Sequence, residues 1–174
     1  MEEIEVKIIE INPPAIIKIL EQLGAQKVFD GEMNSIYFDC QGEFKKSRKT
    51  LRLRQKKEIS ILTFKLKKKE SQVRINEELE TQVQNFEITR KILKNLGFRE
   101  VSVDIRRRIS YRLKRSLVEI DFYRGIPPSL EVESPSKEEL RQIVKLLGYS
   151  MAQTKRWSGK RLLEHYKSFD YKSL

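Results

Sequence analysis

Residues 3–8 read Glu3-Ile4-Glu5-Val6-Lys7-Ile8, with a charged and an apolar side chain alternating at every step. Successive side chains of a strand point to opposite faces, so the two glutamates and the lysine would share one face. An ordinary half-solvated antiparallel strand shows the same alternation. The stretch therefore predicts a strand, and its wider meaning depends on whether the pattern recurs.

The alternation does recur, and the charges it presents are sorted by sign. Like charges two residues apart on one face repel each other, and most sheets mix the two signs. A chain that repeats such pairs is expected to bind something between them. The cationic pairs are Arg52 with Arg54, Lys65 with Lys67, and Arg106 with Arg108. The acidic pairs are Glu3 with Glu5, Glu78 with Glu80, Glu119 with Asp121, and Glu131 with Glu133.

Three amphipathic helices are predicted between these strands. One follows Asn12 and stops at Gly24, one covers roughly residues 84–96, and one follows the capping residue Ser136 and stops at Gly148. If the helices pack outside a sheet that curls on itself, the charged faces line the interior of a barrel. The predicted fold class is α+β, an antiparallel β-barrel tunnel of about eight strands in one domain, residues 1–174. The second helix is expected to pack through Phe86, Leu93 and Leu96.

Composition narrows the class of protein. The net charge of +11 favours a polyanionic partner, and a charged fraction of 35% requires charge where ordinary domains place neutral residues. The single cysteine, Cys40, excludes an internal disulfide and suggests a reducing compartment. No apolar run approaches the ~18 to 20 residues that span a bilayer, and no signal peptide opens the chain. We expect a cytoplasmic protein without a membrane partner.

An interior lined by these pairs suits a phosphate chain held together with divalent cations. Arginine forks match phosphate oxygens, and lysine supplies a compact positive charge. The carboxylates have no cysteine or histidine companions, since His165 is the only histidine. Such oxygen donors favour Mg²⁺ or Mn²⁺ over zinc.

The same residues carry a family resemblance. The opening Glu3-x-Glu5-x-Lys7 resembles the ExExK signature of the CYTH superfamily, which groups class IV adenylyl cyclases, thiamine triphosphatases and related triphosphate tunnel metalloenzymes. The chain departs from the family pattern at Arg106, the first residue of the Arg106-x-Arg108 pair, where the family more usually has lysine. The resemblance continues, in order, through Tyr37-x-Asp39, Leu51-Arg52-Leu53-Arg54, Thr63-Phe64-Lys65, Glu78-x-Glu80, Arg106-x-Arg108, Glu119-x-Asp121 and Glu131-x-Glu133.

The resemblance implies a barrel tunnel that holds a triphosphate and a divalent metal, and it gives each charged residue a role. Catalytic roles fall to Glu3, Glu5 and Lys7. The expected metal ligands are Glu3, Glu5, Glu119, Asp121, Glu131 and Glu133. The expected substrate-binding residues are Lys7, Arg52, Arg54, Lys65, Lys67, Arg106, Arg108 and Lys155.

Three functions remain open at this point. Hydrolysis of an inorganic or organic triphosphate, such as tripolyphosphate or thiamine triphosphate, is the leading hypothesis. A class IV adenylyl cyclase that converts ATP to cyclic AMP and pyrophosphate would use the same charges. A non-catalytic nucleic-acid or polyanion binding module would also explain the net charge, although only 9% of residues are aromatic and could stack on bases. The sequence leaves a homodimer open.

Overall fold

The structure is a computed structural model that describes residues 2–68 and 73–167, apart from the side chains of residues 2, 3, 45 and 74. Eight strands in this part of the chain follow the hydrogen-bonded order β1-β5-β4-β3-β2-β6-β7-β8, which closes on itself as a barrel. This confirms the predicted fold class. The strands are β1 (Glu2–Ile9), β2 (Gln26–Asp39), β3 (Lys49–Lys56), β4 (Ile59–Lys67), β5 (Arg74–Val83), β6 (Arg99–Leu113), β7 (Ser116–Phe122) and β8 (Ser129–Ser134).

The chain divides into two compact units. The first unit comprises residues 1–2, 31–69 and 76–106, and the second comprises residues 3–30, 70–75 and 107–174. Each unit has its own apolar core and its own set of buried charges. That the whole chain is a single domain stays a prediction.

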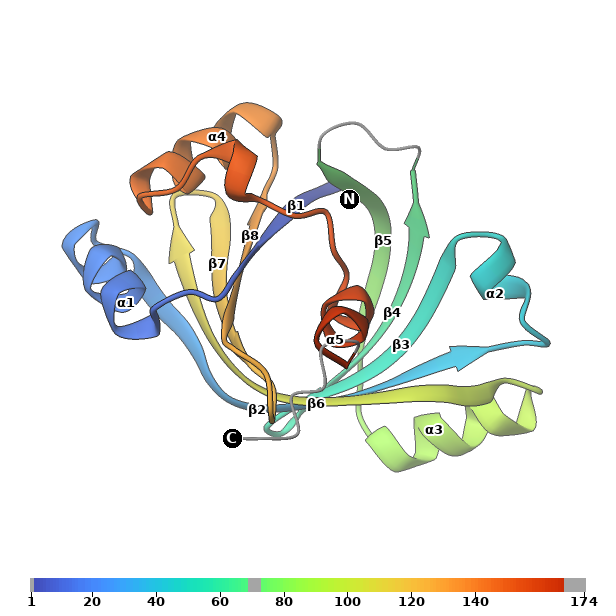
Figure 1. Ribbon diagram of the computed structural model, residues 1–174. Coiled ribbons are helices and arrows are strands. Elements are labelled where there is room, and N and C mark those ends of the chain that lie inside the picture. Colours follow the sequence, from blue (N-terminus) through green and yellow to red (C-terminus); the bar gives the residue numbers. More distant parts are fainter. Residues whose placement is uncertain (1, 69–72, 168–174) are drawn as a thin grey trace. The chain divides into compact units, whose positions relative to one another are not determined.

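In the second unit, two helices cover the apolar faces of the strands. Helix α1 (Pro13–Gln22) buries Ile16 and Leu20, and α4 (Lys137–Leu146) packs against β7 and β8 (Figure 1). The strand residues in this core alternate with the charged ones, as Val118 and Ile120 do with Glu119. The charged face of each strand is therefore the face turned away from these helices.

In the first unit, α3 (Phe86–Asn95) plays the same part, and the short α2 (Glu43–Lys46) lies between β2 and β3 in the chain. Phe86 and Leu93 are buried as predicted, on a core formed with residues of β2 and β3. The prediction for Leu96 is wrong, since this residue is 67% exposed. The helix ends at Asn95, and Leu96 is its C-cap, with Gly97 next in the left-handed conformation that stops the helix.

The C-terminal region of the second unit comprises a 3₁₀ turn at Met151–Gln153 and α5 (Gly159–Lys167). Between them Lys155 pairs with Lys7 through both main-chain hydrogen bonds, of 2.8 and 2.7 Å. Leu162 and Tyr166 of α5 are buried beside Tyr123. None of the helices that the structure describes combines the length and the apolar composition needed to cross a bilayer.

Candidate functional site

Arg108 is the centre of a buried charge cluster in the second unit. Its Nε and one terminal nitrogen donate to the two oxygens of Asp121, at 2.6 and 2.7 Å, and its other terminal nitrogen donates to Glu119. Glu131 lies 3.5 Å from the guanidinium and accepts a 2.5 Å hydrogen bond from the ammonium of Lys7. Two cations and three carboxylates that sequence analysis placed in the site are thus in direct contact.

The register of the strands explains this cluster. Arg108 is directly opposite Asp121 in the β6–β7 pair, and Glu119 is opposite Glu131 in the β7–β8 pair. Lys7 on β1 is opposite Glu131 on its other side. Opposed residues share a face of the sheet, so the charges meet on the one face that the helices do not cover.

The charge state of Arg108 follows from its surroundings. Burial acts to lower its pKa, but the nearby charges of Asp121, Glu119 and Glu131 outweigh burial and raise the pKa well above its ordinary value. The guanidinium therefore stays protonated throughout the pH range in which a protein is folded. A permanent cation of this kind can bind phosphate oxygens as well as carboxylates.

A second feature of this unit is a pair of carboxylates that face each other. Glu5 on β1 is directly opposite Glu133 on β8, and Glu5 is buried. Like charges in this position repel, and an oxygen-seeking divalent cation between them would remove the repulsion. The pair therefore supplies two oxygen donors of the type that Mg²⁺ and Mn²⁺ prefer. The side chain of Glu3, two residues before Glu5, lies outside the described part of the structure.

Metal binding needs more than this pair. Within residues 2–68 and 73–167, no group of three or more carboxylate, histidine or cysteine side chains is arranged to hold a metal ion. Glu119, Asp121 and Glu131, which were predicted to be metal ligands, contact Arg108 and Lys7 in this structure, and their role as ligands stays a prediction. The structure thus groups the predicted carboxylates as one facing pair and one cation-bound cluster.

Lys155 lies beside the Lys7 cluster. Because Lys7 and Lys155 exchange both main-chain hydrogen bonds, they form an opposed pair whose side chains leave the same face. The Lys155 ammonium also lies 5.9 Å from the centre of the Trp157 ring. Lys155, one of the predicted substrate-binding residues, is therefore adjacent to Lys7.

The first unit holds a separate buried cluster around Arg52. A terminal nitrogen of Arg52 donates to the Thr63 hydroxyl at 3.2 Å, and that hydroxyl donates to Glu80 at 2.9 Å. The same nitrogen lies 3.9 Å from the Glu80 carboxylate. Two residues further along the same two strands, β4 and β5, Lys65 forms an ion pair with Glu78.

The remaining predicted cations of the first unit also have polar neighbours. Arg54 donates to the Ser35 hydroxyl at 3.3 Å, and Arg106 forms an ion pair with Asp104. Arg52, Arg54 and Arg106 are all buried, whereas Lys67 is half-buried. Burying arginine is rare in proteins unless a partner or ligand compensates the charge.

Four small polar residues contact the charged groups without having been predicted as site residues. Thr63, Ser35 and Ser110 are buried hydroxyls that contact the charged groups, and Ser110 donates to Glu119 at 3.0 Å. Asp104 is the carboxylate that binds Arg106. Residues two apart on a strand point to the same face. The sequence could therefore have indicated three of these residues, because Thr63, Asp104 and Ser110 lie two positions from Lys65, Arg106 and Arg108.

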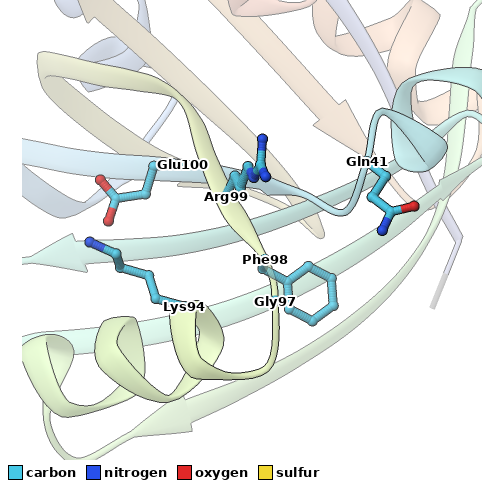
Figure 2. A pocket seen from close by; sticks show the side chains of 6 residues that line it. All are labelled: Gln41, Lys94, Gly97, Phe98, Arg99 and Glu100. Atoms are coloured by element: carbon cyan, nitrogen blue, oxygen red, sulfur yellow. The ribbon is translucent and has the colours of Figure 1, made fainter.

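A surface pocket of about 550 Å³ lies elsewhere in the first unit, where α3 leads into β6 (Figure 2). None of the predicted site residues lines it. Glu100 on its rim is held by a bidentate ion pair with Arg90, at 2.7 and 2.8 Å. Its lining residues are Gln41, Lys94, Gly97, Phe98, Arg99 and Glu100.

The chain is similar in sequence to one protein, and in structure to another, that carry the same description. A Methanocaldococcus jannaschii protein named "Putative adenylate cyclase" is 27% identical over 160 residues, which cover 86% of this chain and 91% of that protein. A Vibrio parahaemolyticus structure, also described as a "putative adenylate cyclase", has a TM-score of 0.82 and 18% identity, covering 93% of this chain and 97% of that one.

A Hippeastrum structure, described as a "putative adenylyl cyclase" with a dominant triphosphatase activity, has a TM-score of 0.65. Its identity is 18% and the match covers 96% of both chains. At this identity the two structures show a shared fold. The model of the CYTH domain family matches residues 1–156, which are most of the chain and include nearly all of both charge clusters. The chain therefore belongs to the CYTH domain family.

Proposed function

We propose that this protein is a divalent-metal-dependent enzyme that cleaves a triphosphate by hydrolysis. The observation that carries the proposal is the burial of five cations, each at most 8% exposed. Taking a cation out of water costs several kcal/mol, so a fold that does so repeatedly is expected to use the charges on an anionic ligand. The five are Lys7, Arg52, Arg54, Arg106 and Arg108.

The phosphate-binding role falls first to the arginines. The Nε of Arg52 is buried and makes no hydrogen bond among the described residues, so this guanidinium has a donor to offer a phosphate oxygen. Arg54, Lys65 and Arg106 would supply further positive charge in the first unit. Lys7, Arg108 and Lys155 would do so in the second unit, with Lys67 as a half-buried addition to the first.

A divalent cation would be held by Glu5 and Glu133, with Glu3 as the third carboxylate expected from the alternation of the strand. When bound, Mg²⁺ or Mn²⁺ neutralises charge on the phosphate oxygens and lowers the pKa of a coordinated water. The protein's own part is to place these carboxylates opposite one another and to keep the neighbouring cations protonated. Glu119 and Asp121 would hold Arg108 in position.

In hydrolysis a carboxylate accepts the proton of the attacking water while the arginines stabilise the charge on the phosphoryl oxygens. Glu131 is suited to this role because its side chain is 17% exposed, more than those of Glu119 and Asp121. The ammonium of Lys7, which donates to Glu131, would fix its orientation. Catalysis would then consist mainly of positioning and charge neutralisation.

Cyclisation of ATP to cyclic AMP and pyrophosphate is the second candidate. It is favoured by the archaeal relative named as an adenylate cyclase. Hydrolysis is favoured by the triphosphatase activity ascribed to the structural relative from Hippeastrum. The two reactions differ in the attacking group, which is water in one and the ribose 3′-hydroxyl in the other.

The proposal is tested by incubating the purified chain with Mg²⁺ or Mn²⁺ and tripolyphosphate, thiamine triphosphate or ATP. We expect orthophosphate as the product, and cyclic AMP would instead establish the cyclase. Glu5→Gln should lose metal-dependent turnover and keep its thermal unfolding transition, because the change removes a charge and preserves the shape of the side chain. Turnover near the wild-type level in Glu5→Gln would contradict the metal assignment.

A further inference from the structure

Asn76 is a buried side chain of the first unit that the proposed reaction does not use. It is 0% exposed, and neither its carboxamide oxygen nor its nitrogen has a hydrogen-bond partner among the described residues. Leaving a buried amide unpaired is unfavourable, and proteins rarely tolerate it without a reason. The Asn76 carboxamide can therefore both donate and accept a hydrogen bond from a ligand.

The position of Asn76 relates it to the charged cluster of the first unit. It lies on β5 directly opposite Lys67 of β4, and alternation places it on the same strand face as Glu78 and Glu80. Glu78 is paired with Lys65, and Glu80 contacts Arg52 through Thr63. Asn76 thus precedes these two acidic residues on the same face of β5 and, unlike them, carries no charge.

The spacing along the strands gives the length that a ligand would have to span between Arg52 and Asn76. The Lys67–Asn76 pair and the Thr63–Glu80 pair are four residues apart on each strand, which corresponds to about 13 Å. A ligand that binds at Arg52 through its phosphates must extend by roughly that length to reach Asn76. A carboxamide, unlike a lysine or arginine, offers an adjacent donor and acceptor and no charge.

We propose that Asn76 recognises the organic part of a triphosphate substrate and so distinguishes it from bare tripolyphosphate. This inference rests on the proposed function and adds a specificity residue to it. The matching ligand group is a neighbouring donor and acceptor, such as the exocyclic amine and ring nitrogen of adenine, which asparagine binds through two hydrogen bonds. Lys67 lies opposite Asn76 and is half-buried, so a ligand would reach the amide by displacing this side chain.

The test compares kcat/KM for ATP and for tripolyphosphate, with Mg²⁺ present, in the wild-type protein and in Asn76→Leu. Leucine has the same number of side-chain heavy atoms, branched at the same position, and no hydrogen-bonding group. We expect kcat/KM for ATP to fall about 10- to 100-fold, the effect of two lost hydrogen bonds to a base, while that for tripolyphosphate stays within about threefold. An unchanged ratio of the two values would overturn the inference.

The matched control is Asn34→Leu. Asn34 is in the same unit, and its carboxamide oxygen is also buried without a partner among the described residues, but it alternates with the charged face and lies on the side of Ile36 and Phe38. This variant should leave the ratio unchanged. If Asn76→Leu does not fold, Asn76→Ser keeps a small polar group and should show the same selective loss to a smaller degree.

Calorimetric binding separates this inference from the proposed function. If the wild-type protein turns over neither compound, the proposed hydrolysis fails by itself. Titration of ATP and tripolyphosphate into wild type and Asn76→Leu then decides the role of Asn76. Selective loss of ATP binding supports it, whereas equal binding of ATP by both proteins, or no ATP binding by the wild type, overturns it.

Discussion

At the scale of single residues, Arg108 stabilises three carboxylates of the second unit. Removing it while keeping its volume, in Arg108→Met, would leave Asp121, Glu119 and Glu131 as buried or partly buried negative charges with less compensation. Breaking a buried ion pair from one side costs about 3–5 kcal/mol. We expect urea unfolding to show a loss of that size.

The pH dependence of this loss follows from the direction of the pKa shift. The pKa of Arg108 is raised well above its ordinary value because three carboxylates outweigh burial, so its contribution is fully present below that ordinary value. It would be lost only as the pH rises through the folded-state pKa. The stability difference between wild type and Arg108→Met should therefore be constant from neutral pH to about pH 10, and a decline within that range would contradict the assignment.

Some contacts of the charge cluster could be predicted from the sequence, and others could not. The pairing of Arg108 with Asp121 follows from the two-residue turn between Leu113 and Ser116, which fixes the register of the β6–β7 hairpin. The contact of Lys7 with Glu131 could not be predicted, because these two residues are 124 positions apart in the chain. Local turns determine register, whereas the closure of a sheet is decided by the whole chain.

At the scale of elements, the start of α4 is fixed to the β6–β7 turn by Glu139. Its carboxylate accepts hydrogen bonds from the main chain and guanidinium of Arg115 and from the hydroxyl of Ser116. Burial acts to raise its pKa, but these hydrogen bonds outweigh burial and lower the pKa below 4.5. The stabilisation is therefore present above pH 4.5 and is lost as the pH falls through the folded-state pKa.

We expect Glu139→Gln to destabilise the protein by about 1–3 kcal/mol at neutral pH, the cost of disturbing buried hydrogen bonds to a charge. The difference from wild type should shrink as the pH falls below 4.5, because protonation removes the same charge from the wild-type protein. Glu138→Gln, an exposed residue of the same helical turn, is the control and should have little effect. A difference that grows toward acid pH would refute the role of Glu139.

Most elements could be predicted because alternation and helix stops are local signals. Apolar character alone does not identify burial, as Leu96 and Ile105 show. On β6, alternation places Ile105 on the same strand face as Ile109 and Tyr111. Ile105 is nevertheless 57% exposed, whereas Ile109 and Tyr111 are buried. The helix that buries an apolar strand face has a finite length, and residues beyond it stay exposed.

At the scale of the whole molecule, a net charge of +11 predicts some attraction to any polyanion. Binding of a single-stranded oligonucleotide should be metal-independent, fall steeply with salt and be unaffected by Arg52→Gln, because a buried arginine cannot reach a polymer backbone. Fluorescence anisotropy with EDTA, at two salt concentrations, measures this. Tight binding that withstands salt and depends on Arg52 would favour the nucleic-acid module instead.

The central claim is that the buried charges bind a triphosphate together with a divalent cation. Calorimetric titration of tripolyphosphate, with Mg²⁺ and then with EDTA, tests it most directly in the wild type and in Arg52→Gln. We predict saturable binding that EDTA weakens and that Arg52→Gln weakens at least about tenfold, the loss of a charge-assisted hydrogen bond to phosphate. The account would be contradicted if the wild type did not bind tripolyphosphate. It would also be contradicted if Arg52→Gln bound tripolyphosphate as tightly as the wild type does, both with Mg²⁺ and with EDTA.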